Sequence, residues 1–311
     1  MSAAKNDDQT QVMGKVLSGD AATANIVVLG NSSAREALLA DDDFNQLLAQ
    51  QNSTRLKMMN LATSGQSPIE SLLIAEEISP REGQVFILVN SQVGLGNPRP
   101  FQAIERGGFL LSPEKLITKY SNRNIFPAHW REPFNRFVYE VRATRHTYYL
   151  RIKHQLKYWL GEKLYGRPQP SYQTHWYSEN SALAATVKEQ AISISKDDFK
   201  KNAVTNLHFT RNTIAVLADY LRQRKCRFIV ALSPEAKGEF RQLFPNESHM
   251  HEEMLQGLQS TSHIELLDLS DKVTLQPADF HDLTHLNRSG RIKWSTALAT
   301  WLLKQNLASA K

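Results

Sequence analysis

Two short motifs near opposite ends of the 311-residue chain carry residue types that can together perform acyl chemistry. Ser32 is the third residue of a Gly-Asn-Ser-Ser run at 30–33, and Asp282 and His285 begin and end an Asp-Leu-Thr-His run. A serine hydroxyl becomes a strong nucleophile when an imidazole takes its proton and a carboxylate fixes the tautomer of that ring. Since Asp282 and His285 are three residues apart in a predicted turn, we expect their side chains to meet and Nε2 to face Ser32.

The elements that must position these residues are short apolar strands alternating with helices. The apolar run 26–29 stops at Gly30 and leads into a helical stretch at 34–39, which would place Ser32 at a helix N-terminus, where partial positive charge favours a developing anion. We predict further strands at 56–61, 85–89, 227–232 and 264–269, and further helices at 68–78, 213–224, 252–259 and 289–304. Near-continuous apolar strands alternating with helices predict an α/β fold, a three-layer sandwich with a mainly parallel sheet.

The helix at 68–78 has the clearest boundary signal. Ser67 is the predicted N-cap and Pro68 occupies the first helical position. At the other end of the chain, Asn287 or Ser289 is expected to cap the final helix.

Oxyanion donors are the next requirement of acyl chemistry. Ligand sites of parallel sheets gather beyond the carboxyl ends of the strands, where Ser32, Gly65, Asn90 and the loop 282–285 all fall. Candidate donors are the backbone N–H groups of Ser32 and Gly65 and the side-chain amide of Asn90, with Gln92 as a weaker choice. Gly65 is equally well explained as a turn glycine with positive φ. Asn90 also suits a simple hydrogen-bonding role at a strand end.

The order of these motifs resembles the SGNH (GDSL-type) hydrolase superfamily. Within it, the stretch 282–291 is most similar to the branch that includes the D-alanine transfer protein of teichoic acid modification and the alginate O-acetylation proteins. The resemblance implies a flavodoxin-like SGNH fold, with Ser32 as nucleophile, His285 as base, Asp282 as orienting acid and Gly65 as an oxyanion donor. Asn31 stands where the family usually has aspartate. The usual third-strand motif, Gly-x-Asn-Asp, is not recognisable at 89–92.

The chain divides into three parts by pattern. Residues 1–24 form a polar N-terminal tail, residues 25–96 and 206–311 form the α/β domain, and residues 97–205 form a helical insertion. Within the insertion, apolar residues recur at helical spacing between 138 and 164 with Lys and Arg interleaved, which predicts a lid or cleft-wall helix with its cations outward. The alternative is that this basic segment binds an anionic polysaccharide, a membrane surface or nucleic acid, but it contains no nucleic-acid motif.

Composition and motifs limit the remaining possibilities. A formal charge of +6 gives a mildly basic surface. No Gly-rich phosphate loop supports a nucleotide-binding protein, and we predict no cofactor. His281 and His285 are four residues apart, and the segment 249–253 is rich in His and Glu, but neither has a third ligand placed by sequence. We therefore predict no metal site and expect 249–253 to begin a solvated helix.

The sequence thus predicts a serine esterase or O-acyltransferase. By resemblance, its substrate is an O-acylated, in particular O-acetylated, cell-envelope polysaccharide, and its partner is a membrane-bound O-acyltransferase rather than nucleic acid. The alternative is a non-catalytic accessory protein that binds glycan or such a partner. Because the first 24 residues contain no apolar segment of signal-peptide type, we expect a periplasmic or extracytoplasmic membrane-associated location if an anchor has been removed, and a cytoplasmic one otherwise.

Overall fold

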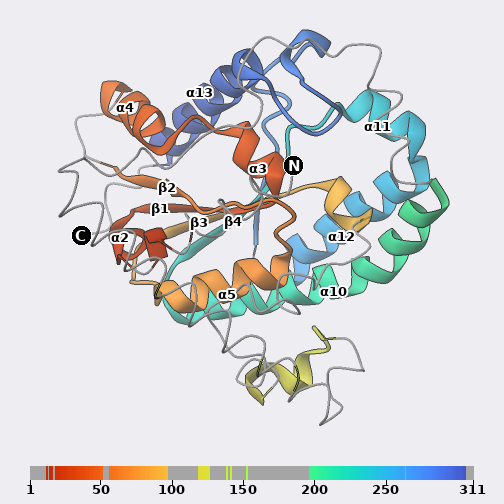
Figure 1. Ribbon diagram of the computed structural model, residues 1–311, viewed down its shortest axis with the longest axis horizontal. Helices are drawn as coiled ribbons and strands as arrows, with labels where there is room; N and C mark the ends of the chain where they lie inside the picture. Colours follow the sequence, from red (N-terminus) through yellow and green to blue (C-terminus); the bar gives the residue numbers. More distant parts are fainter. Residues whose placement is uncertain are drawn as a thin grey trace.

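The computed structural model describes residues 18–51, 56–96, 118–126, 196–262 and 264–305, with isolated positions at 12, 14–16, 138, 141 and 152. They form an α/β fold around a five-stranded sheet whose strands are all parallel, in the order β2-β1-β3-β4-β5 (Figure 1). The strands are β1 (Ile26–Gly30), β2 (Met58–Asn60), β3 (Val85–Asn90), β4 (Arg227–Leu232) and β5 (Glu265–Leu267). The predicted α/β class and parallel sheet are confirmed, although β2 and β5 are shorter than predicted.

Helices cover both faces of the sheet (Figure 1). On one face lie α3 (Ser32–Ala37), α4 (Asp41–Gln51) and α13 (Arg288–Lys304), and on the other lie α5 (Pro68–Ile78), α10 (Lys196–Gln223) and α12 (Pro245–Ser262). The shorter elements are α2 (Asp20–Thr23), α11 (Lys237–Leu243), η1 (Gln92–Gly96), η2 (Ser121–Arg123) and η4 (Pro277–Asp279). Alternate residues of β1 enter the two cores, Ile26 and Val28 toward the α13 side and Val27 and Leu29 toward the α5 side, which is why the strand has no polar position.

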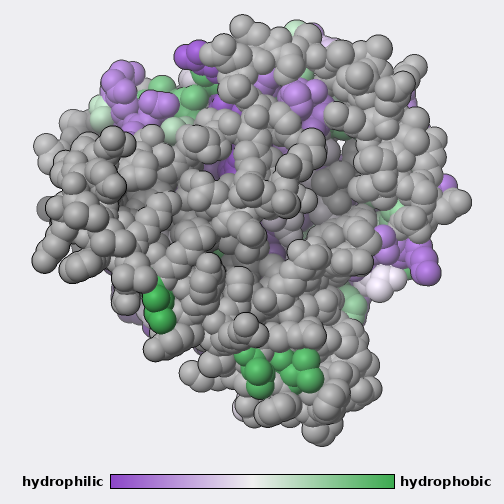
Figure 2. All heavy atoms as spheres, in the orientation of Figure 1, coloured by the Kyte–Doolittle hydropathy of each residue, from purple (hydrophilic) through white to green (hydrophobic). Residues whose placement is uncertain are grey.

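Local sequence signals explain two helix starts. Ser67 caps α5 and Pro68 lies in its first turn, as the sequence predicted. Glu70 completes a reciprocal capping box with Ser67, which was not predicted. Asn287 caps α13 by accepting a hydrogen bond from the backbone N–H of Gly290 at 3.2 Å. Asp41, Asp42 and Asp43 form the first turn of α4, where negative charge is favourable, and hydrophilic side chains gather over this helix in Figure 2.

Several predicted boundaries were wrong. α10 begins at Lys196 rather than at residue 213, so this helix crosses the predicted boundary between the insertion and the α/β domain. α4 and α11 were not predicted as helices. Part of the predicted polar tail is packed into the fold, because Ala21 is buried in the core and the Nζ atom of Lys15 pairs with Asp41 at 2.7 Å.

Residues 118–126 of the predicted insertion pack on α5 and α10 (Figure 1). The side chains of Lys119 and Tyr120 both bind Glu76 of α5, and Ile125 and Phe126 are buried in the same core. Most of the predicted lid helix lies outside the described residues. Two of its apolar positions, Val141 and Ile152, are described and are exposed, so they do not pack as the predicted stripe required.

Within the part of the chain that the structure describes, no helix is both long enough and apolar enough to cross a membrane.

Candidate active site

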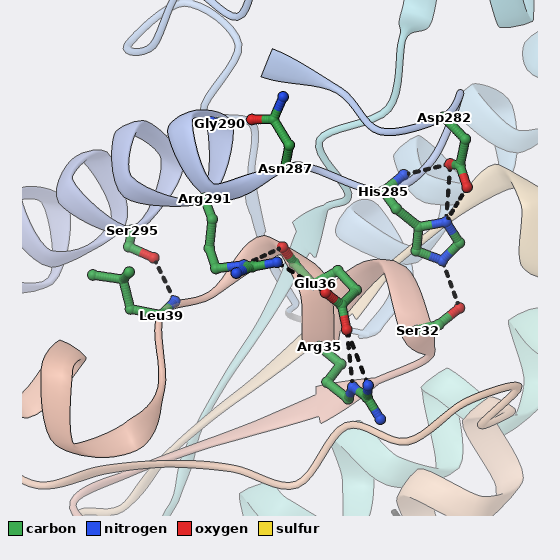
Figure 3. Close-up of polar contacts among 10 residues, drawn as sticks. All are labelled: Ser32, Arg35, Glu36, Leu39, Asp282, His285, Asn287, Gly290, Arg291 and Ser295. Atoms are coloured by element: carbon green, nitrogen blue, oxygen red, sulfur yellow. Dashed lines mark hydrogen bonds and ion pairs between the residues drawn. The ribbon is translucent and has the colours of Figure 1, made fainter. Parts of the chain in front are cut away.

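The structure brings Ser32, His285 and Asp282 into hydrogen-bond contact, although Ser32 and His285 are 253 residues apart in sequence (Figure 3). Nε2 of His285 lies 2.9 Å from Oγ of Ser32, and Nδ1 lies 2.7 Å from Oδ2 of Asp282. Ser32 and His285 are both partly exposed. These distances are those of a nucleophile, a base and an orienting carboxylate.

The loop that carries Asp282 and His285 is held together by its own hydrogen bonds. Oδ1 of Asp282 accepts the backbone N–H groups of Thr284 and His285, both at 2.8 Å. Burial alone would raise the pKa of Asp282, but hydrogen bonding and charge from His285, together with the two backbone N–H groups, leave this pKa below its ordinary value. An ionised Asp282 can only accept, so Nδ1 of His285 carries the proton and Nε2 is left as the acceptor for the Ser32 hydroxyl.

Ser32 is presented by a tight turn between β1 and α3. Gly30 has a φ of 144°, and a Cβ atom there would lie 2.7 Å from both the Cβ of Ala34 and the main-chain oxygen of Val89. Only glycine fits this position. Asn31 is the N-cap of α3, because its Oδ1 accepts the backbone N–H of Ser33 at 3.0 Å. This cap needs an acceptor oxygen and no charge. Asparagine can therefore cap the helix as well as the aspartate that is usual in the superfamily whose motif order this sequence resembles.

Ser33, the neighbouring hydroxyl, is placed differently. Ser33 is fully buried, and its Oγ has no hydrogen-bond partner among the described residues. The geometry therefore distinguishes Ser32 from Ser33 as the candidate nucleophile.

A buried ion pair joins the helix that begins at Ser32 to the helix that follows His285 (Figure 3). Nη2 of Arg291, on α13, lies 2.9 Å from Oε2 of Glu36, and its Nε donates to the main-chain oxygen of the same residue at 3.2 Å. Arg35 contributes a further bond to Oε1 of Glu36 at 3.1 Å. Beyond α3, the backbone N–H of Leu39 donates to Oγ of Ser295 at 2.9 Å.

The predicted oxyanion donors lie at or just beyond the carboxyl ends of the neighbouring strands β1, β2 and β3. Gly65 is exposed in the turn after β2, with φ of 70°, which confirms the prediction that this glycine adopts positive φ. Asn90 ends β3 beside β1, since Gly30 pairs with Val89 in the sheet. Among the described residues, no hydrogen bond joins Gly65 or Asn90 to Ser32, so their part in an oxyanion hole stays a prediction. Gln92, the weaker choice, lies in η1, where its Oε1 accepts the hydroxyl of Ser248 at 2.9 Å.

His251 is a polar contact of Asn90 that sequence reasoning missed. It was expected at a solvated helix start, but it lies inside α12, is buried, and its Nε2 is 2.8 Å from Nδ2 of Asn90. Because an amide nitrogen only donates, Nε2 of His251 must accept. The nearby His249 is exposed and lies 3.4 Å from Glu253. Across the described ranges, no group of His, Cys, Asp and Glu is arranged to hold a metal ion. No sequence signal pairs Asn90 with His251, because the contact depends on how α12 packs near the end of β3.

A cavity of about 380 Å³ lies beside the loop 282–285, beyond the ends of β4 and β5. Its lining includes Ala236 and Phe280, and the backbone N–H of Ala236 donates to the main-chain oxygen of Leu283 at 2.9 Å. The described lining does not include Ser32 or His285. The candidate site is therefore defined by the contacts of Ser32 and not by this cavity.

No protein-family model matches the chain, and no curated protein has significant sequence similarity to it.

Proposed function

We propose that the protein is a serine esterase or O-acyltransferase of SGNH type that works through an acyl-enzyme on Ser32. The observation that carries this proposal is the 2.9 Å contact between Nε2 of His285 and Oγ of Ser32, with Asp282 at 2.7 Å from the other ring nitrogen. A purely structural role for His285 would not explain why one ring nitrogen contacts a serine hydroxyl and the other contacts a carboxylate.

The reaction follows from the position of each group. Ser32 Oγ attacks the acyl carbonyl carbon while His285 Nε2 takes its proton, and ionised Asp282 stabilises the resulting imidazolium. The tetrahedral intermediate collapses when the ester C–O bond breaks and His285 returns the proton to the departing alcohol oxygen. Water or a sugar hydroxyl then attacks the acyl-enzyme, again with His285 as the base, and Ser32 is released with its proton.

The oxyanion would be stabilised by the backbone N–H of Ser32, with Gly65 and Asn90 as the further candidates. Each donor of this kind typically contributes about 2.7–4 kcal/mol to transition-state stabilisation.

The substrate class comes from the resemblance and not from the site itself. We propose an O-acetylated cell-envelope polysaccharide as the substrate and a membrane-bound O-acyltransferase as the partner. Hydrolysis and transfer use the same residues and differ only in whether water or a bound hydroxyl reaches the acyl-enzyme. Incubation with an acetylated glycan and a second, unacetylated glycan distinguishes them, since a transferase moves acetate to the second glycan and an esterase releases it.

The catalytic proposal is tested with 4-methylumbelliferyl acetate and a fluorophosphonate probe on the wild type, Ser32→Ala and Ser33→Ala. Ser33→Ala is a matched control, because it removes a buried hydroxyl that has no partner in the described part of the chain. We expect Ser32→Ala to lose at least about 10³-fold in kcat and all labelling, and Ser33→Ala to keep both. Labelling that persists in Ser32→Ala contradicts the proposal, and a wild type without turnover or labelling favours a binding protein.

A further inference from the structure

We infer that Arg291 is a positioning residue for the proposed Ser32–His285–Asp282 triad. It holds α3, which begins at Ser32, so that the Ser32 hydroxyl stays within proton-transfer distance of His285. The inference rests on the proposed esterase or acyltransferase function, which supplies the reaction that the position serves. The two bonds described for Arg291 across the helix pair both go to Glu36 of α3. Arg291 acts through Glu36.

The two halves of the catalytic contact are held in different ways. Asp282 and His285 share one turn, so their distance is set by the loop itself. Ser32 begins α3, whereas His285 lies just before Asn287, the N-cap of α13. The distance from Nε2 to Oγ therefore depends on how α3 and α13 are placed relative to each other.

Arg291 joins the two helices at points that are near both groups in sequence. It lies in the first turns of α13, and Glu36 lies four residues after Ser32 in a helix of only six residues. The main-chain oxygen of Glu36 is among the last carbonyls of α3, which have no partner inside a helix. Nε of Arg291 supplies that partner at 3.2 Å while Nη2 binds the carboxylate at 2.9 Å.

Burial makes this contact rigid and selective for arginine. The side chains of Arg291 and Glu36 are 3% and 0% exposed, so water cannot replace either bond. One planar guanidinium binds a carboxylate and a backbone oxygen at once, whereas a lysine ammonium is a point charge on a flexible stem. Arg291→Lys therefore keeps the charge that Glu36 needs and loses the two-point contact.

The chain also offers a matched control between the same two segments. Oγ of Ser295 accepts the backbone N–H of Leu39, but this bond lies after the end of α3 and further along α13. Ser295→Ala should weaken the packing of the segment after α3 on α13 without releasing the end of α3 that bears Ser32. A purely structural role for Arg291 predicts that both variants lose activity in proportion to lost stability.

The kinetic test measures kcat and KM for 4-methylumbelliferyl acetate, with thermal unfolding of each variant. We expect Arg291→Lys to lower kcat by about 10- to 100-fold with KM within about twofold, because a displacement near 1 Å at a catalytic contact can cost about 10²-fold. Ser295→Ala should keep kcat within about twofold of the wild type, even if its Tm falls by as much as that of Arg291→Lys. An unchanged kcat in folded Arg291→Lys, or losses that follow Tm in both variants, overturns the inference.

A spectroscopic test does not depend on turnover. In protein labelled with ¹⁵N-histidine, the Nε2 shift of His285, assigned with His285→Gln, reports whether this nitrogen accepts the Ser32 hydroxyl, and Ser32→Ala gives the reference value without that bond. We expect Arg291→Lys to move to the Ser32→Ala value and Ser295→Ala to stay at the wild-type value. An Arg291→Lys shift equal to the wild type overturns the positioning role, as does a Ser32→Ala shift equal to the wild type, because no contact then exists to be positioned. If the expected pattern is seen in a wild type without esterase or transferase activity, the positioning role stands and the proposed function fails.

Discussion

The candidate site has two sides, the nucleophile–base side and the acyl-oxygen side. Among the described residues, hydrogen bonds connect the members of the first side but not those of the second. On the nucleophile–base side, Ser32, His285 and Asp282 are joined by contacts of 2.7–2.9 Å. On the acyl-oxygen side, Gly65 is in an exposed turn and the amide of Asn90 is bound to His251. The candidate nucleophile and base are therefore already in contact in this structure, whereas the candidate oxyanion donors have to be identified by functional measurements.

The largest effects should follow changes on the nucleophile–base side. We expect Asp282→Asn to lower kcat by about 10³- to 10⁴-fold, because a neutral amide no longer holds the proton on Nδ1 of His285 and leaves the wrong tautomer facing Ser32. The measurement is kcat for an acetyl ester, with circular dichroism to verify folding. A loss of less than about tenfold would show that His285 does not depend on Asp282, and would contradict the role given to Asp282 on the nucleophile–base side.

On the acyl-oxygen side, Asn90→Ala should have the next largest effect. An amide nitrogen has two hydrogens, so the bond to His251 leaves one for an oxyanion. Loss of one such donor typically lowers kcat by about 10²- to 10³-fold. Steady-state kinetics with KM little changed would support the donor role. A normal kcat in Asn90→Ala would assign Asn90 to packing with His251 alone.

His251→Gln is the control for that variant, since a glutamine oxygen can still accept from Asn90. Its kcat should stay closer to that of the wild type than the kcat of Asn90→Ala does.

A smaller effect is expected from Gly65→Ala, because this substitution adds a methyl group and leaves the backbone N–H of the turn in place. A Cβ atom at Gly65 would meet no atom within 4 Å, so the cost is the positive φ of 70°, of roughly 1 kcal/mol in stability. The backbone N–H is retained, and we expect kcat within about fivefold of the wild type. Urea unfolding and ester kinetics measure the two quantities. A kcat loss of 100-fold in a folded Gly65→Ala would mean that the turn must move during the reaction.

The smallest expected change concerns stability near the turn of Gly65. Burial raises the pKa of Glu70 to about 8, against the lowering effect of its hydrogen bonds from Ser67. Since the folded-state pKa is above the ordinary value of 4.5, the stabilising contribution of protonated Glu70 is complete below about pH 4.5 and is lost as the pH rises through 8. Relative to the wild type, Glu70→Gln should gain at least about 1 kcal/mol between pH 5 and pH 8. Urea unfolding at several pH values measures this, and parallel curves for the two proteins would show that Glu70 ionises normally.

The sequence predicted those parts of the fold that local signals determine. β1, β3 and β4 are apolar throughout most of their length. Ser67 and Pro68 indicate the start of α5. α4 was missed because it opens with three aspartates and its fit against β2 depends on Asn45, whose side chain bonds both backbone groups of Met58. Such a bond between a helix and a strand leaves no periodic trace in the sequence.

The same division applies to the site. Ser32 at a strand-to-helix turn and Asp282 with His285 in one loop are local patterns, and their meeting followed from the rule that ligand sites lie beyond the carboxyl ends of parallel strands. The contacts of Asn90 with His251 and of Glu36 with Arg291 connect residues 161 and 255 positions apart. These pairs depend on the packing of whole helices, and nothing in either local sequence identifies the partner.

The central claim, that Ser32 is the residue acylated in the reaction, is tested most directly by mapping the covalent adduct. The wild type and Ser33→Ala are treated with a fluorophosphonate or an acetyl ester, digested, and examined by tandem mass spectrometry across residues 30–33. We expect one adduct, on the side chain of Ser32, in both proteins, and none in Ser32→Ala. An adduct on Ser33, or one that is unchanged in Ser32→Ala, would contradict it.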